Sequence, residues 1–134
     1  MGFPVFLLII PDSGQMYYLS EKIDILDKRI VNTIRACKDQ IRHMVGKTEM
    51  QIVLYGSQAR ADAEQDSDLD LLVLVPDSVN LTQKRAIHDA IYEIGLDNDV
   101  VVSVIITTHR QWESPVTQSL PLYKNITQEG IRVV

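Results

Sequence analysis

The chain has 134 residues, of which 46% are hydrophobic and 23% charged, and its 18 acidic against 13 basic side chains leave a net charge of -5. This length holds one domain with a hydrophobic core and leaves little room for a separate substrate-binding domain. The acidic balance argues against nucleic acid as a partner, because proteins that bind the phosphate backbone present Lys and Arg. The single cysteine, Cys37, excludes an internal disulfide and speaks against a cysteine-based zinc cluster.

The N-terminal segment is strongly apolar at positions 3–10. This stretch is far shorter than the ~20 residues that span a bilayer. No Lys or Arg precedes it and no cleavage site of small residues is clear, so it does not match a signal peptide. We expect residues 1–19 to be an edge strand or an extension outside the working domain, which we place at 20–134. We expect a cytoplasmic protein that does not bind membranes.

Two elements are predicted before the first glycine-serine turn. Apolar residues recur every three or four positions from Ser20 to about Val45, which indicates an amphipathic helix with Ser20 as its N-cap. Gly46 is a natural end for this helix, and Cys37 falls on its apolar face, where we expect a packed thiol. The run from Met50 to Tyr55 then predicts a buried strand.

The middle of the chain predicts a short helical turn, a loop and a second strand. Ser57 to Ala61 fits one helical turn, and Asp62 to Ser67 fits a polar loop. Leu69 to Val75 is an apolar run, interrupted only by Asp70, that ends before Pro76, which is typical of a strand covered on both faces.

The last third predicts a helix, a strand and a helical end. Thr82 is expected to cap the second long helix and Gly95 to end it, and Val100 to Ile106 is the third predicted strand. Trp112 is expected to pack near the edge of the sheet, and the remaining residues suggest one or two short helices and a tail. Helices alternating with strands predict an α/β fold.

The most informative pattern joins a glycine-serine turn to two aspartates. Gly56 and Ser57 are followed by ten residues and then by Asp68 and Asp70. Side chains alternate along a strand, so the two carboxylates are expected on one face. Carboxylate oxygens bind hard divalent cations, and the N–H groups of a turn that opens a helix bind phosphate. The pattern therefore predicts a phosphate site beside a metal site.

This block resembles the nucleotidyltransferase superfamily typified by DNA polymerase β, and most closely its small minimal nucleotidyltransferase branch. That family carries Gly-Ser, ten residues and then Asp-x-Asp or Asp-x-Glu, and four further residues of this chain match positions common in it: Ala59, Arg60, Asp62 and Ser67. The pair Glu129-Gly130 also resembles the ending of stand-alone members. The resemblance covers roughly residues 20–134. It implies a small mixed β-sheet with helices packed mainly on one side.

The resemblance also implies an activity. Asp68 and Asp70 would hold Mg²⁺ or Mn²⁺ and act as the catalytic pair, while Gly56 and Ser57 would bind the phosphates of a nucleoside triphosphate, with ATP expected first. Arg60 would reach the triphosphate, or would instead pair with Asp62 at the surface. A nucleoside monophosphate (NMP) would pass to a hydroxyl of a protein or small-molecule acceptor, releasing pyrophosphate. Relatives of this size often pair with a helical protein as the antitoxin half of a toxin–antitoxin module.

One expected group is missing. In the family a third carboxylate comes from the next strand, yet residues 100–107 contain no acid, and Ser103 aligns with that position. Asp99 lies four residues earlier, ~13 Å away along a strand, and would substitute only in a different register; Glu64 or Asp66 on the loop are further candidates. A second interpretation follows, in which the chain is a catalytically impaired nucleotide-binding module that acts as an antitoxin-like partner or sensor.

Overall fold

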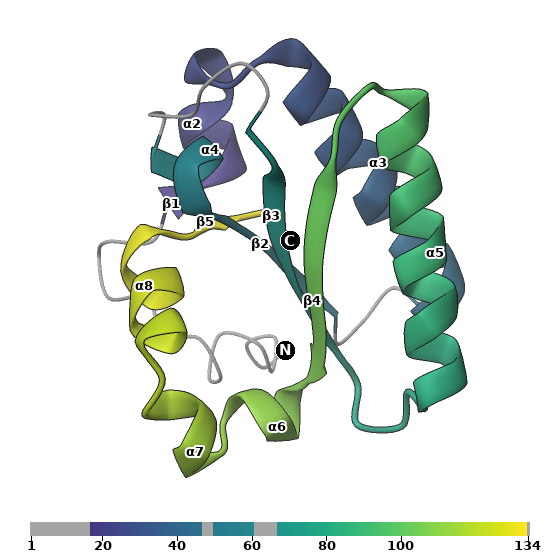
Figure 1. Cartoon of the computed structure of the whole chain (residues 1–134), viewed down its shortest axis with the longest axis vertical. Coiled ribbons are helices and arrows are strands. Elements are labelled where there is room, and N and C mark those ends of the chain that lie inside the picture. Colours follow the sequence, from purple (N-terminus) through teal and green to yellow (C-terminus); the bar gives the residue numbers. More distant parts are fainter. Residues whose placement is uncertain (1–16, 47–49, 61–66, 134) are drawn as a thin grey trace, which may run out of the picture.

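The computed structural model describes residues 17–46, 50–60 and 67–133. Within these residues the chain forms one mixed sheet (Figure 1), whose strands follow in the order β1 (Tyr17–Tyr18), β5 (Ile131–Arg132), β2 (Gln51–Tyr55), β3 (Leu69–Val75) and β4 (Val102–Thr108). β3 and β4 are parallel, as are β1 and β5, whereas β2 runs antiparallel to both β3 and β5. The predicted α/β class with a small mixed sheet is confirmed.

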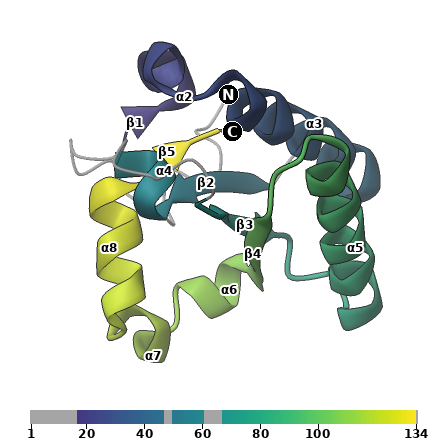
Figure 2. The ribbon, with the colours of Figure 1, turned by 45° about the horizontal axis from the view of Figure 1, so that its top comes forward.

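The two faces of the sheet are covered unequally. The long helices α3 (Lys28–Val45) and α5 (Leu81–Asp97) lie on one side of the sheet. The short helices lie on the opposite side (Figure 2): α6 (His109–Trp112), α7 (Pro115–Gln118) and α8 (Pro121–Glu129). The main core lies under α3 and α5. A smaller apolar cluster lies on the opposite face and consists of Val53, Leu72, Leu74, Trp112 and Ile126.

Strand β3 is apolar except at Asp70, because both of its faces are covered. Leu69, Leu71, Val73 and Val75 belong to the main core, whereas Leu72 and Leu74 belong to the smaller cluster. Both sets are fully buried, as expected for a central strand. By the same alternation, the side chain of Asp70 is on the face of the smaller cluster.

Two packing predictions are confirmed. Cys37 is fully buried in the main core, and burial raises the pKa of its thiol to about 12. Trp112 is 3% exposed, and its ring centroid lies 4.9 Å from that of Tyr123 on α8.

The first predicted helix is wrong at its start. Instead of one helix from Ser20, the chain forms α2 (Leu19–Lys22), the 3-10 helix η1 (Ile23–Ile25) and then α3, which Gly46 ends as predicted. Leu26 is extended (φ -91°, ψ 143°), which interrupts the helical path. The carboxylate of Asp27 accepts a hydrogen bond from the amide of Arg29 (2.7 Å) and is the actual N-cap of α3.

Both predicted boundaries of the second long helix are also corrected. Asn80 rather than Thr82 caps α5, because Asn80 and Gln83 exchange side-chain and backbone hydrogen bonds in a capping box. Gly95 does not end α5, which continues to Asp97. A Cβ atom on Gly95 would lie 2.5 Å from the carbonyl oxygen of Val100, so this glycine allows helix and strand to pack closely.

The C-terminal half differs from the prediction in two further ways. Strand β4 begins at Val102 and ends at Thr108, two residues later at each end than predicted. The predicted tail contains β5, which pairs antiparallel with β2. At the other end of the chain, Tyr17 and Tyr18 pair with β5, so the sheet includes two residues of the predicted extension. None of the described helices is long and apolar enough to cross a membrane.

Candidate functional site

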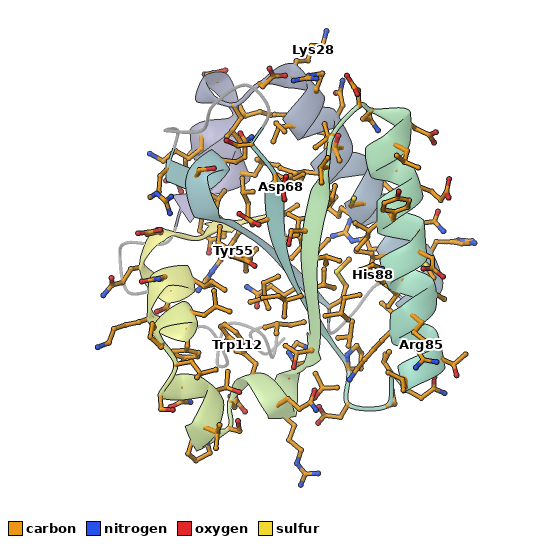
Figure 3. The ribbon with its side chains drawn as sticks, viewed as in Figure 1. Lys28, Tyr55, Asp68, Arg85, His88 and Trp112 are labelled. Carbon is orange, nitrogen blue, oxygen red and sulfur yellow. The ribbon has the colours of Figure 1, made fainter. Side chains whose placement is uncertain are left out.

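Three strands place polar side chains in one row. Asp70 on β3 is opposite Tyr55 on β2 and opposite Ser103 on β4. Residues in register on neighbouring strands present their side chains on the same face, so Tyr55, Asp70 and Ser103 share a face of the sheet. Asp68 comes two residues before Asp70, just outside β3. Tyr55 and Asp68 lie near α4 (Gly56–Arg60), and Trp112 lies toward the other end of the sheet (Figure 3).

Gly56 holds the backbone of the turn against Asp70. Its φ of +75° is in the left-handed region that favours glycine. A Cβ atom there would overlap Oδ2 of Asp70 and would lie 3.1 Å from its Cγ. A side chain at this position is therefore excluded twice, by backbone conformation and by space, and the turn and the carboxylate are in direct contact.

The environment of Asp70 favours its neutral form. The side chain is half-buried, and desolvation raises the pKa of its carboxyl above the usual value, with a further increase from the negative charge of Asp68 and an opposing effect of Arg60. Desolvation and the charge of Asp70 also raise the pKa of the Tyr55 phenol. The carboxylates of Asp68 and Asp70 repel each other, and a bound cation would relieve this repulsion.

The donor set fits one hard divalent cation. Asp68 and Asp70 could supply carboxylate oxygens and Ser103 a hydroxyl, and such oxygen groups are the usual ligands of Mg²⁺ and Mn²⁺. In the part of the chain that the structure describes, no group of three or more His, Cys, Asp and Glu side chains is arranged to hold a metal. A centre with three carboxylates is thus not formed by residues 17–46, 50–60 and 67–133.

The register brings Ser103, and not Asp99, beside Asp70. Ser103 is exposed and directly opposite Asp70. Asp99 lies in the turn between α5 and β4, and its Oδ2 is 3.7 Å from Nη1 of Arg29 on α3. The shift of register that a role for Asp99 requires is therefore not observed. Glu64 and Asp66 lie outside the described residues.

Arg60 has a partner that the sequence did not suggest. Its Nη1 lies 3.1 Å from Oε2 of Glu129 at the end of α8. Asp62, the partner considered from the sequence, lies outside the described residues. The Arg60–Glu129 pair links the glycine-serine block to the Glu-Gly pair near the C-terminus, two motifs that are 69 positions apart.

Two more residues of the site were missed by sequence reasoning. Gln58 is 9% exposed, and its Nε2 donates to the carbonyl oxygen of Ser67 (3.3 Å), which fixes the backbone next to Asp68. Tyr55 was assigned only to a strand. Alternation along the strand restricts Tyr55 to one of the two faces, but its pairing with Asp70 depends on the register of β2 and β3, which the sequence did not supply.

Known proteins resemble the chain over most of its length. Residues 34–133 match the model of the nucleotidyltransferase domain family. A relative from Methanocaldococcus jannaschii, named "Putative protein adenylyltransferase MJ0141", is 31% identical over 77 residues, which cover 58% of this chain and 78% of the relative.

Fold, site and comparisons together define the class. A small mixed sheet that joins a glycine-serine turn to paired aspartates is the arrangement of a nucleotidyl-transferring enzyme, and this chain is a transferase of that class. The chain belongs to the nucleotidyltransferase domain family.

Proposed function

We propose that the chain transfers NMP, with ATP as the donor, to a hydroxyl group of a protein acceptor and releases pyrophosphate. The observation that supports this proposal is the close approach of the Gly56 backbone to the Asp70 carboxylate. It would set the proposed phosphate-binding turn directly beside the proposed cation site. The name of the archaeal relative, which contains the words protein adenylyltransferase, supports a protein acceptor over a small molecule.

Each residue has a role in this proposal. Asp68 and Asp70 hold Mg²⁺ or Mn²⁺, which would neutralise charge on the triphosphate. Gly56 and Ser57 begin α4. The first N–H groups of a helix have no acceptor within it, and here they would donate to the phosphates. Arg60 lies close enough to lower the pKa of Asp70. To reach the nucleotide, Arg60 would break its ion pair with Glu129 or contact Glu129 and the nucleotide together.

Because Ser103 takes the place of a third carboxylate, the acceptor proton needs another destination. In the transfer, the acceptor oxygen forms a bond to the α-phosphorus, the bond to the pyrophosphate oxygen breaks, and the hydroxyl proton is released. Ser103 stands where a third carboxylate would take that proton, and a serine hydroxyl is a poor base. We infer that the proton leaves to solvent, so that transfer is slow and accelerates as pH rises toward the pKa of the acceptor hydroxyl.

Incubation with ATP labelled at the α-phosphate, Mg²⁺ or Mn²⁺, and proteins encoded by adjacent genes tests the proposal. Label should appear on a protein, and Asp68→Asn together with Asp70→Asn should abolish it. Ser103→Asp is the sharpest variant, because a positioned base contributes about 10²-fold or more. We expect it to raise the rate and to flatten the pH profile, with Ser103→Asn as the uncharged control.

A second function is favoured by the same serine. Without a third carboxylate, the chain would bind Mg-nucleotide without turnover and would act as a sensor or as the antitoxin-like partner of a helical protein. In that case no label is transferred, while nucleotide still raises the melting temperature and Asp70→Asn removes that increase. Label transfer by the wild-type chain would exclude this second function.

A further inference from the structure

Among the described residues, strand β4 forms an outer edge of the sheet without the usual protection. In the order β1-β5-β2-β3-β4, no described strand pairs with its free side. Sheets protect exposed edges with short strands, charged side chains or proline. The opposite edge follows this rule, because β1 is two residues long, whereas β4 has seven residues, Val102–Thr108, with no charge and no proline.

The register identifies the groups that are free at this edge. The amide of Leu69 donates to the carbonyl of Val101 (2.8 Å), so the backbone of Val101 faces β3. Backbone groups of successive residues alternate in direction along a strand. Val102, Val104 and Ile106 therefore direct N–H and C=O away from β3, while Ser103 bonds to it. Three residues of β4 are available to an added strand.

Helix α5 provides a second, independent feature beside this edge. It packs against β4 (Figure 1) and its charges are segregated along its length. The amino-terminal half carries Lys84 and Arg85, whereas the carboxyl-terminal half carries the acidic residues Asp89, Glu93 and Asp97. Exposed apolar side chains adjoin them: Tyr92 is 56%, Leu96 58% and Val101 66% exposed.

We propose that the chain forms a homodimer in which two β4 strands pair antiparallel about Val104. In this register Val102 is opposite the partner's Ile106, so no charge is buried. A twofold axis that makes β4 antiparallel to its copy also makes the two α5 helices antiparallel, which sets each basic half against an acidic half. An uncharged strand and a helix with segregated charges are both complementary to themselves, and this favours a second copy over an unrelated peptide.

The dimer would have a consequence for the site. The twofold axis is perpendicular to the continuous sheet, so both Asp68–Asp70 pairs would open on the same face. Ser103 would lie opposite the partner's Ile105. The proposal does not depend on the transfer reaction, since association can be measured without nucleotide.

The experiment measures the mass of the full chain by sedimentation over a range of concentrations. We expect a dimer. Val104→Pro removes an outward N–H and should give a monomer, as proline is tolerated where the N–H faces outward on an edge. Val104→Ala, which also shortens the side chain but keeps the N–H, should remain dimeric. A monomeric wild type, or a dimeric Val104→Pro variant, would overturn the proposal.

Charge reversal tests the orientation of the two copies. Arg85→Glu should weaken association by about tenfold or more, and adding Glu93→Arg should restore it. Equal weakening by the double variant would exclude the antiparallel arrangement of α5. Hydrogen exchange of the wild type is decisive if Val104→Pro does not fold. The amides of Val102, Val104 and Ile106 should become protected as concentration rises, and protection that instead requires another protein would refute the dimer.

Discussion

The two faces of the sheet divide stability from chemistry. On the face under α3 and α5, every second residue of β3 is apolar. Leu69, Leu71, Val73 and Val75 belong to one large core. The opposite face is mixed: Leu72 and Leu74 join the small cluster of Trp112 and Ile126, while the end near α4 presents Tyr55, Asp70 and Ser103. A half-covered face leaves room for ligands and keeps the Asp70 carboxylate, whose pKa is raised by burial and by the charge of Asp68. Substitutions on the two faces should separate these roles, from the largest expected change in the free energy of unfolding to the smallest.

Truncation of the main core should have the largest effect. Ile34 and Ile126 are both fully buried, in the main core and in the small cluster respectively. Ile34→Ala should lower the free energy of unfolding by about 4 kcal/mol, and Ile126→Ala by about 2 kcal/mol, within the range for such truncations. Urea titration measures both. Equal losses would show that the two clusters contribute alike.

Gly56→Ala should damage both stability and the site. A left-handed alanine costs about 1 kcal/mol, and overlap with Asp70 should add to this, for a total of about 2–3 kcal/mol with nucleotide binding lost. Gly46→Ala is a control without overlap, because Gly46 also has a positive φ (+94°, with ψ 170°) and a Cβ there meets nothing within 4 Å. A loss of only about 1 kcal/mol in Gly56→Ala would mean that the overlap with Asp70 has no energetic role.

Asp70→Asn should stabilise the protein while abolishing transfer. The carboxyl of Asp70 has a pKa in the folded state above its unfolded value. Below the usual Asp range it is neutral in both states and does not destabilise the fold. As pH rises through the folded pKa, this stability is lost, because the folded state holds an unfavourable charge. Without metal or nucleotide, the asparagine variant should melt about 1–4 °C higher than the wild type at neutral pH. The gain should disappear at a pH below the usual range for aspartate. A lower melting temperature at neutral pH would contradict the raised pKa.

Glu129→Gln should have the smallest effect on stability. The pair with Arg60 is part-exposed, and such pairs contribute about 0–1 kcal/mol. The free energy of unfolding should change by about 0.5 kcal/mol or less. Release of Arg60 toward the phosphates should tighten ATP binding, measured by calorimetry, and Arg60→Lys in the same background should reverse this gain. Weaker binding by Glu129→Gln would mean that Glu129 positions Arg60 for the nucleotide.

Much of the fold followed from local pattern. Leu69–Val75 is the predicted strand without change, because a short apolar run that ends before proline has few other interpretations, even with Asp70 inside it. The start of α3 was missed, since Ser20 and Asp27 are both good caps and the choice depends on how Leu26 is held. Likewise Gly95 looked like a helix end, but the close packing of Val100 requires a glycine inside the helix.

The sequence by itself determined the family and the candidate cation pair, because both depend on residue types at short, fixed spacing. Gly56, Asp68 and Asp70 lie within one turn, loop and strand, and no other part of the chain is needed to recognise them. Only the tertiary structure decided what surrounds them. Three features depend on strand register and on packing between distant segments, which no local spacing specifies. Ser103 stands beside Asp70, Glu129 pairs with Arg60, and no described strand pairs with the outer side of β4.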